Sequence, residues 1–203
     1  MAGLTALQLG LFEAGKKAFG RSIMEEEGLG PVHNMVSCAA CHSNPIGGSG
    51  SISVSMFGRA DERGFDPLYE LGGPLLQGAA IRPECEEQIP REANVTTERI
   101  TTSALGAGLI EAVADASIVR LAELSSAGIT GRVHWVAALE DPPGRAKRVG
   151  RFGWKCQIAT VLSFSAVAAR DELGFTNALL PTEMAPNGDR SLIRKYDRVP
   201  DPE

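Results

Sequence analysis

Apolar residues recur at helical spacing in three stretches of this 203-residue chain, and each stretch predicts an amphipathic helix. The first runs from Leu4 to Ile23, the second from Ser103 to Leu124 and the third from Lys155 to Leu173. Within the second stretch, Asp115 is placed to act as the N-cap of a separate helix. The expected apolar side of the third stretch consists of Ile158, Val161, Leu162 and Val167.

Turn-forming residues separate these stretches. The chain contains 23 glycines and 12 prolines, more than an average globular protein. Residues 43–53 are a loop by composition, residues 54–60 suit a short strand or an extended segment, and residues 65–83 are rich in turns. We therefore expect a mostly α fold, with short helices joined by long loops, arranged as a single domain over residues 1–203.

Composition narrows the class of protein further. Apolar residues make up 43% and charged residues 22%, which is typical of a globular chain. The net charge of −5 argues against a nucleic-acid partner. No window approaches the roughly 18 apolar residues of a membrane span, and the N-terminus lacks the basic start of a secretory signal. We expect no nucleic-acid partner and no membrane span.

The clearest chemical motif is Cys38-Ala39-Ala40-Cys41-His42, which has the CxxCH spacing of covalent haem attachment. At this spacing the two thiols can add across the two vinyl groups of one haem. The next residue then offers an imidazole nitrogen to the iron. Chance would produce the motif in on the order of one such chain in a thousand. The motif predicts one covalently bound haem c, held by Cys38 and Cys41, with His42 as the proximal iron ligand.

Two other interpretations of the motif are weaker. A zinc site needs a second pair of ligands, and the remaining histidines, His33 and His134, are far apart. A thioredoxin-like dithiol would stand in a βαβ context, which the pattern does not show. The remaining cysteines, Cys85 and Cys156, could form a disulfide in an oxidising compartment or stay as two separate thiols.

Several blocks of the sequence, in order, resemble the di-haem oxidoreductase family of peroxidase-like proteins. They are "GLGPVHNMVSCAACHSNPIGGSG", "FDPLYELGGPLLQ", "ALGAGLIEAVADASI", "GITGRV" and "RVGRFGWKCQIATV". The resemblance implies a cytochrome c-like domain that exchanges electrons with a small redox protein and uses hydrogen peroxide as a substrate. Covalent haem c also predicts a periplasmic location, although this chain shows no signal peptide.

The chain departs from the family pattern in one respect that affects function. Family members are longer and carry a second CxxCH, whereas this sequence contains one. We therefore expect the first haem domain only, which transfers electrons as the N-terminal part of a di-haem oxidoreductase. The alternative is a haem-binding module, or a truncated remnant, without turnover.

Further residues are candidates for roles around the haem. Glu111 lies in an apolar stretch and could be the acid–base group of peroxide cleavage, or it could simply form a structural hydrogen bond. Arg151 could pair a haem propionate, and Trp154 could donate its indole N–H or carry electrons, unless it is ordinary core. Met56 is the leading distal iron ligand. Weaker distal candidates are Met24, Met35, Met184, His33 and His134. Asn34 is expected to cap the turn before the motif.

Overall fold

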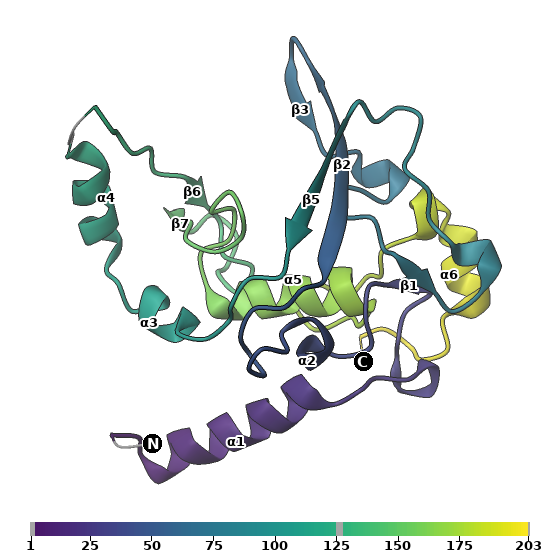
Figure 1. Ribbon diagram of the computed structural model, residues 1–203, viewed down its shortest axis with the longest axis horizontal. Coiled ribbons are helices and arrows are strands. Elements are labelled where there is room, and N and C mark those ends of the chain that lie inside the picture. Colours follow the sequence, from purple (N-terminus) through teal and green to yellow (C-terminus); the bar gives the residue numbers. More distant parts are fainter. Residues whose placement is uncertain (1–2, 125–127, 203) are drawn as a thin grey trace.

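The computed structural model describes residues 3–124 and 128–202 and shows a mixed α and β fold (Figure 1). The helices are α1 (Ala6–Gly20), α2 (Cys38–Cys41), α3 (Ala107–Glu111), α4 (Asp115–Glu123), α5 (Val161–Leu173) and α6 (Arg190–Tyr196). The strands are β1 (Val32–His33), β2 (Ser53–Asp61), β3 (Gly64–Asp66), β4 (Ala79–Ala80), β5 (Val95–Ile100), β6 (Trp135–Val136) and β7 (Arg148–Val149). Short 3₁₀ helices are η1 (Glu25–Glu27), η2 (Tyr69–Leu71), η3 (Pro83–Cys85) and η4 (Pro186–Gly188).

Three small antiparallel sheets make the expectation of a mostly α fold wrong. The largest has the order β3-β2-β5, and the others pair β1 with β4 and β6 with β7. In the largest sheet Ser53 pairs with Ile100 and Gly58 with Val95. The segment that forms β5 is mostly polar, and its apolar and polar residues do not alternate. The sequence pattern therefore did not predict a strand there. The backbone of β5 is ordered by the partner strand β2, which lies far away in sequence.

Helix boundaries also differ from those expected. The second stretch divides into α3 and α4, and the N-cap of α4 is Ala114, so Asp115 lies inside the helix. The third stretch is helical only from Val161, because the hydroxyl of Thr160 accepts a hydrogen bond from Ser163 N and caps α5 there. The buried residues of α5 are Ser163, Ala166 and Leu173, and Leu162 is 57% exposed. The expected apolar side of this helix was therefore wrong.

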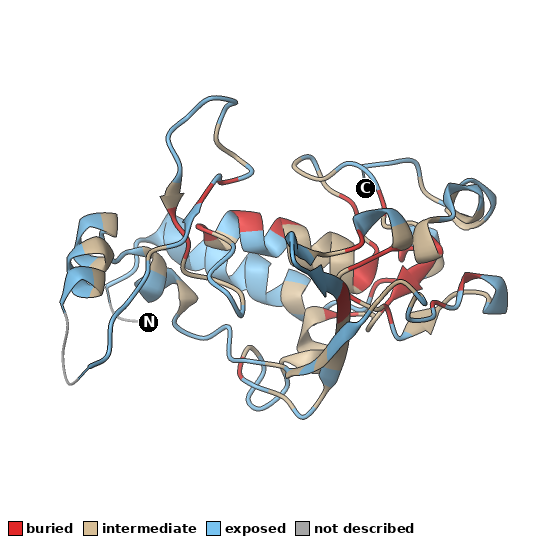
Figure 2. Ribbon diagram, turned by 90° about the horizontal axis from the view of Figure 1, so that it is seen from above, coloured by how far each residue is buried: buried red, intermediate tan, exposed pale blue. Residues whose placement is uncertain are grey.

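The core is divided into small clusters around α5. One consists of Ile23, Leu29 and Leu173, and Cys38 packs against it. The other consists of Val136, Ala138 and Ala159. Figure 2 shows the buried residues gathered on the side of the C-terminus, while the part that contains α4 is mostly exposed. The two ends of α5 are thus fixed by different, separate parts of the chain.

A close backbone contact joins the C-terminal end of α5 to the segment before the CxxCH motif. Gly174 ends α5 with φ +62°, and Gly30 N donates a hydrogen bond to Leu173 O at 3.3 Å. A Cβ added to Gly30 would lie 2.7 Å from Gly174 Cα. Only glycine at position 30 allows the two backbones to approach so closely, and this approach places the motif beside α5.

Helix α1 forms within the first predicted stretch, but none of its residues is buried, so it has no apolar face packed on the rest of the chain. It contacts the rest of the chain chiefly through α2. Leu7 and Leu11 are 74% and 65% exposed, so these apolar side chains remain largely uncovered. None of the helices in the described part of the chain has both the length and the apolar character needed to cross a membrane.

Candidate functional site

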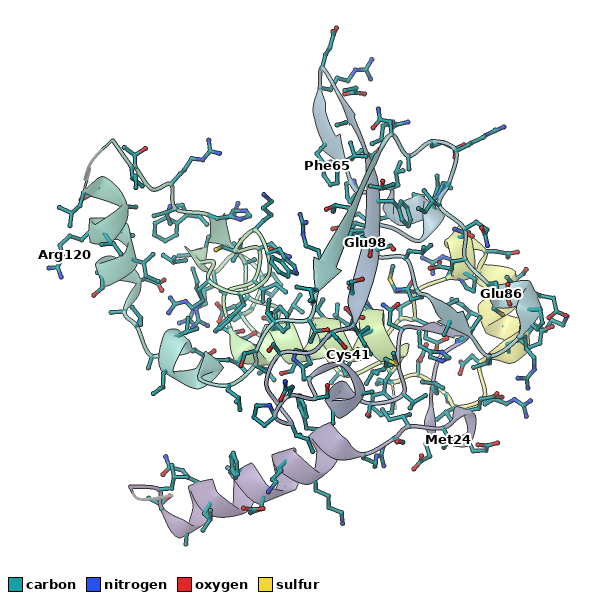
Figure 3. All side chains as sticks on the ribbon, viewed as in Figure 1. Met24, Cys41, Phe65, Glu86, Glu98 and Arg120 are labelled. Carbon is teal, nitrogen blue, oxygen red and sulfur yellow. The ribbon has the colours of Figure 1, made fainter. Side chains whose placement is uncertain are left out.

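The CxxCH motif forms the single helical turn α2. Ser37 caps this turn, because its hydroxyl accepts a hydrogen bond from Ala40 N at 3.2 Å. Both cysteines are half-buried and form no disulfide, and Figure 3 marks Cys41 in the region of α2 and α5. One turn of helix brings the two thiols to the same side of the segment, which is the arrangement that attachment to one haem requires.

His42 follows α2 with a defined orientation of its ring. Its Nδ1 lies 3.1 Å from Gly48 O, and because a carbonyl oxygen can only accept, Nδ1 carries the proton. The Phe19 ring lies 5.8 Å from the imidazole, centroid to centroid. Among the described residues, Nε2 of His42 makes no hydrogen bond. Its lone pair is therefore available to a metal, as in ligating histidines whose other nitrogen donates to a carbonyl.

The loop after the motif folds back tightly over α2. Gly50 N donates to Thr101 O at 3.4 Å, and a Cβ at Gly50 would lie 1.9 Å from Cys41 O. The same loop meets the approach to α3, where Ala104 N and Leu105 N both donate to Gly47 O. The position of the His42 ring therefore depends on a backbone contact that only glycine permits.

Replacing Gly50 by alanine should destabilise the protein by about 1–3 kcal/mol, the usual cost of forcing an extra methyl group into a packed site. Urea unfolding of the variant against the native protein measures this. Gly10→Ala is the matched control, because nothing lies within 4 Å of its added Cβ; it should be neutral or slightly stabilising. Equal stability of the two variants would contradict the tight loop.

The electrostatics of the two thiols do not suit a redox dithiol. Burial raises the pKa of Cys38 and of Cys41, and the carboxylate of Glu172 raises both further. Reactive Cys-x-x-Cys motifs instead have a cysteine whose pKa is lowered. Nor do the residues described in the structure contain a group of three His, Cys, Asp or Glu side chains placed to hold a metal ion. Neither rival interpretation of the motif gains support.

Sequence reasoning missed a half-buried polar cluster next to the motif. The side-chain amide of Asn34 donates to Glu172 Oε2 at 2.7 Å, and its Oδ1 accepts from Gly78 N at 2.9 Å. Asn34 therefore links the motif to α5 and to the segment before β4, and does not merely cap a turn. The neighbouring Gln77 donates to Asp171 O at 2.9 Å. The sequence offered one sign of this cluster: Asp171 and Glu172 stand side by side at the C-terminal end of an apolar helix.

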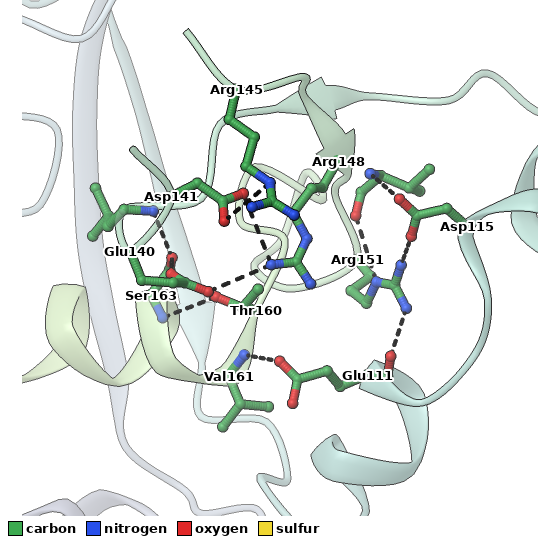
Figure 4. Close-up of polar contacts among 12 residues, drawn as sticks. Glu111, Asp115, Glu140, Asp141, Arg145, Arg148, Arg151, Thr160, Val161 and Ser163 are labelled. Carbon is green, nitrogen blue, oxygen red and sulfur yellow. Dashed lines mark hydrogen bonds and ion pairs between the residues drawn. The ribbon is translucent and has the colours of Figure 1, made fainter. Parts of the chain in front are cut away.

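Glu111 is the last residue of α3, and its side chain reaches the start of α5. Its Oε1 accepts a hydrogen bond from Val161 N at 2.8 Å (Figure 4). This bond satisfies a backbone donor in the first turn of α5. The contact accounts for one carboxylate oxygen and gives Glu111 a structural role in addition to any chemical one.

Arg151 lies below the surface, with 7% of its side chain exposed, and holds the α3–α4 connection together. Its Nη1 donates to the carbonyl oxygens of Ile110, Glu111 and Val113. Its Nη2 forms an ion pair with Asp115, whose other oxygen accepts from Val149 N (Figure 4). The guanidinium is thus occupied by protein groups, and a propionate would have to compete with them.

Trp154 and Met56 occupy different parts of the fold. Trp154 is 49% exposed, so it is not core, and the Arg99 guanidinium lies over its ring at 5.4 Å. Met56 lies on β2, where it pairs with Thr97 of β5 and bridges to Leu75. The structure thus places Arg151 and Glu111 at adjoining positions, while Met56 and Trp154 belong to the sheet and to a surface turn.

The other candidates for the distal position are scattered. His33 is buried in β1, His134 is exposed with Nδ1 3.1 Å from Lys155 O, Met24 is 55% exposed, and Met35 and Met184 are half-buried. The last two cysteines are also apart. Cys85 is fully buried, Cys156 is exposed, and they form no disulfide.

Residues around the motif fit a large apolar group. Leu105, which packs on the post-motif loop at Gly47, is 57% exposed, and Leu109 and Ile110 on α3 are 79% and 50% exposed. Leu162 on α5 is equally uncovered, and α3 contacts α5. Isolated exposed leucines are common, but Leu105 also contacts the loop that follows the motif, so it offers uncovered apolar surface beside His42 and the two cysteines.

The site therefore brings two cysteines and a histidine together on one helical turn and the residue after it. Comparison with protein families gives a match to the one described as "Di-haem oxidoreductase, putative peroxidase", over residues 84–197. This is more than half of the chain, and the chain belongs to the di-haem oxidoreductase family, which confirms the family expected from the sequence blocks. The match begins downstream of the CxxCH motif. Neither the curated proteins nor the solved structures gave a match.

Proposed function

We propose that this protein binds one haem c covalently through Cys38 and Cys41, with His42 as the proximal iron ligand, and transfers electrons. Family membership supports a redox function that depends on haem. The observation that carries the proposal at residue level is the hydrogen bond between His42 Nδ1 and Gly48 O, because it leaves the lone pair of Nε2 available to a metal. The bound haem would supply one-electron chemistry at the iron.

The chain's own residues would orient and shield this group. Gly48 fixes the tautomer of His42, and Phe19 packs against its ring. Leu105, which packs on the post-motif loop at Gly47, offers apolar surface that would exclude water from one side of the bound group. A small redox protein is the proposed electron partner, and the location required for covalent haem attachment is the periplasm.

Expression with export to the periplasm and a haem-maturation system tests the proposal directly. The intact mass should exceed that of the polypeptide by one haem, and the haem should survive denaturation. The same chain kept in the cytoplasm should carry none. A purified, exported protein that is folded but has the mass of the bare polypeptide would refute covalent attachment.

Peroxide reduction is the proposed enzymatic role, as the N-terminal part of a di-haem oxidoreductase. It needs an iron with an open distal position and an acid–base group beside it. Glu111 is the proposed acid–base group, because the hydrogen bond to Val161 N engages only one of its oxygens. The second candidate role is electron transfer without turnover. In that case the hydrogen bond between Glu111 and Val161 N is the whole role of Glu111, and Met56 ligates the iron.

The spectrum of the ferric protein separates these two roles. A high-spin iron that binds cyanide and reacts with peroxide supports the enzymatic role, and Glu111→Gln should then slow the reaction with peroxide about 10²–10⁴-fold. Because glutamine can still accept from Val161 N, this variant should keep the fold. A six-coordinate, low-spin iron that ignores cyanide, and that becomes high-spin in Met56→Ala, would establish electron transfer alone.

A further inference from the structure

Glu172 lies at the C-terminal end of α5, against the segment that carries the two motif cysteines. Its Oε2 accepts a hydrogen bond from Asn34 Nδ2, and its backbone carbonyl accepts one from Asn34 N, both at 2.7 Å. The next residue, Leu173, belongs to the core cluster on which Cys38 packs. Hydrogen bonds on one side and core packing on the other thus hold Glu172 beside the proposed haem.

The surroundings of Glu172 leave its charge unbalanced. On α5 the adjacent Asp171 is paired with Arg170, whose Nε lies 2.6 Å from Asp171 Oδ1. Glu172 itself has a neutral partner, Asn34, and forms no ion pair among the described residues. The other polar or titratable groups that face it are the thiols of Cys38 and Cys41 on α2.

Burial raises the pKa of Glu172; the hydrogen bond from Asn34 opposes this shift and the charge of Asp171 adds to it. The carboxyl group therefore changes its protonation state above the usual range of a glutamate. Its field also reaches the attachment site, because the Glu172 carboxylate contributes to raising the pKa of both motif thiols. A group that affects both sulfur atoms will affect a haem attached to them.

We propose that Glu172 is the redox-linked proton acceptor of this protein, taking up one proton when the haem at Cys38, Cys41 and His42 is reduced. This inference rests on the proposed function. One electron from a small redox protein converts ferric to ferrous iron, and one proton from solvent converts the Glu172 carboxylate to the neutral acid. The net charge of the haem and Glu172 together stays unchanged, and oxidation reverses both steps.

The coupling follows from charge. Ferric haem carries one more positive charge than ferrous haem, and a positive charge favours the ionised form of a nearby carboxyl group. The proton affinity of Glu172 is therefore higher when the haem is reduced. Because such coupling is reciprocal, protonation of Glu172 makes the haem easier to reduce. The reduction potential should accordingly fall as the pH rises through the interval in which Glu172 titrates.

Spectroelectrochemical titration of the haem-loaded protein, from about pH 5 to about pH 9, tests this coupling. We expect the reduction equilibrium constant to fall about tenfold between the acid and alkaline limits, which corresponds to about 59 mV for one electron. In Glu172→Gln this component should vanish, with the potential held near the acid limit, because glutamine still accepts the Asn34 hydrogen bond but cannot ionise. Any haem propionates that titrate do so in both proteins, so the difference between the two isolates Glu172.

Asp171→Asn is the matched control. It removes a charge that favours protonation of Glu172, so the pH-dependent interval should remain but move to lower pH. This second variant keeps the proposal testable if Glu172→Gln folds poorly. An unchanged pH profile in Glu172→Gln, with the haem attached and its spectrum native, overturns the proposal while leaving the haem function intact. Failure to attach haem to the native chain would overturn both.

Discussion

Replacing both Cys38 and Cys41 by alanine will abolish covalent haem attachment completely. The two thioether bonds are the only covalent links that the proposed site can form, because the remaining cysteines lie elsewhere, Cys85 fully buried and Cys156 exposed. Intact mass spectrometry and haem staining of the denatured protein measure the loss. The single variants Cys38→Ala and Cys41→Ala should each retain one link and bind haem less completely.

Cys156→Ala is the control for this experiment. Cys156 is an exposed, unbonded thiol outside the motif, and its replacement should leave the haem content unchanged. A double variant that still carried covalent haem would show that the CxxCH motif is not the attachment site. Loss of haem in Cys156→Ala would show that this thiol takes part in haem attachment.

The second large effect concerns stability and centres on Arg151. Replacement by alanine should lower the free energy of unfolding by about 1–3 kcal/mol, because it leaves one oxygen of the half-exposed Asp115 carboxylate and three backbone carbonyls without their donor. Arg151→Lys should recover part of this loss, since one ammonium group cannot reach all of those acceptors at once. Urea unfolding of the haem-loaded protein measures both.

Arg148→Ala provides a comparison within the same segment of the chain. Arg148 is 42% exposed and lies 3.6 Å from Glu140, and exposed pairs of this kind contribute about 0–1 kcal/mol. We expect a small change for Arg148 and a large one for Arg151. If the two alanine variants were equally stable, the guanidinium of Arg151 would not hold the α3–α4 connection.

Local chemistry could be predicted from the sequence better than architecture could. The spacing of Cys38, Cys41 and His42 is a local property, and the structure forms it as one helical turn. The ordered sequence blocks also predicted the family correctly, since the family match covers residues 84–197. By contrast, the expectation of a mostly α fold failed at β5, which has no apolar periodicity of its own and exists because it pairs with β2.

Some roles assigned to single residues from local sequence were replaced by long-range contacts in the structure. The sequence placed Asp115 at a helix cap, whereas its carboxylate serves Arg151 and Val149, which lie far along the chain. Asn34 was expected to cap a local turn, but its amide bridges Glu172 and Gly78. Long-range hydrogen bonds of this type leave no periodic signal, because their partners are chosen by the fold and not by neighbouring residues.

The sequence by itself determined the haem-type motif, the family and the existence of the main helices, because these depend on local spacing and on ordered blocks. Tertiary structure decided that Glu111 reaches the start of α5, that Gly50 lets the loop close on Cys41, and that Glu172 lies beside the motif with no cation paired to it among the described residues. The physical reason is that burial and long-range hydrogen bonding depend on which segments meet, and no single segment of this chain specifies its own partner.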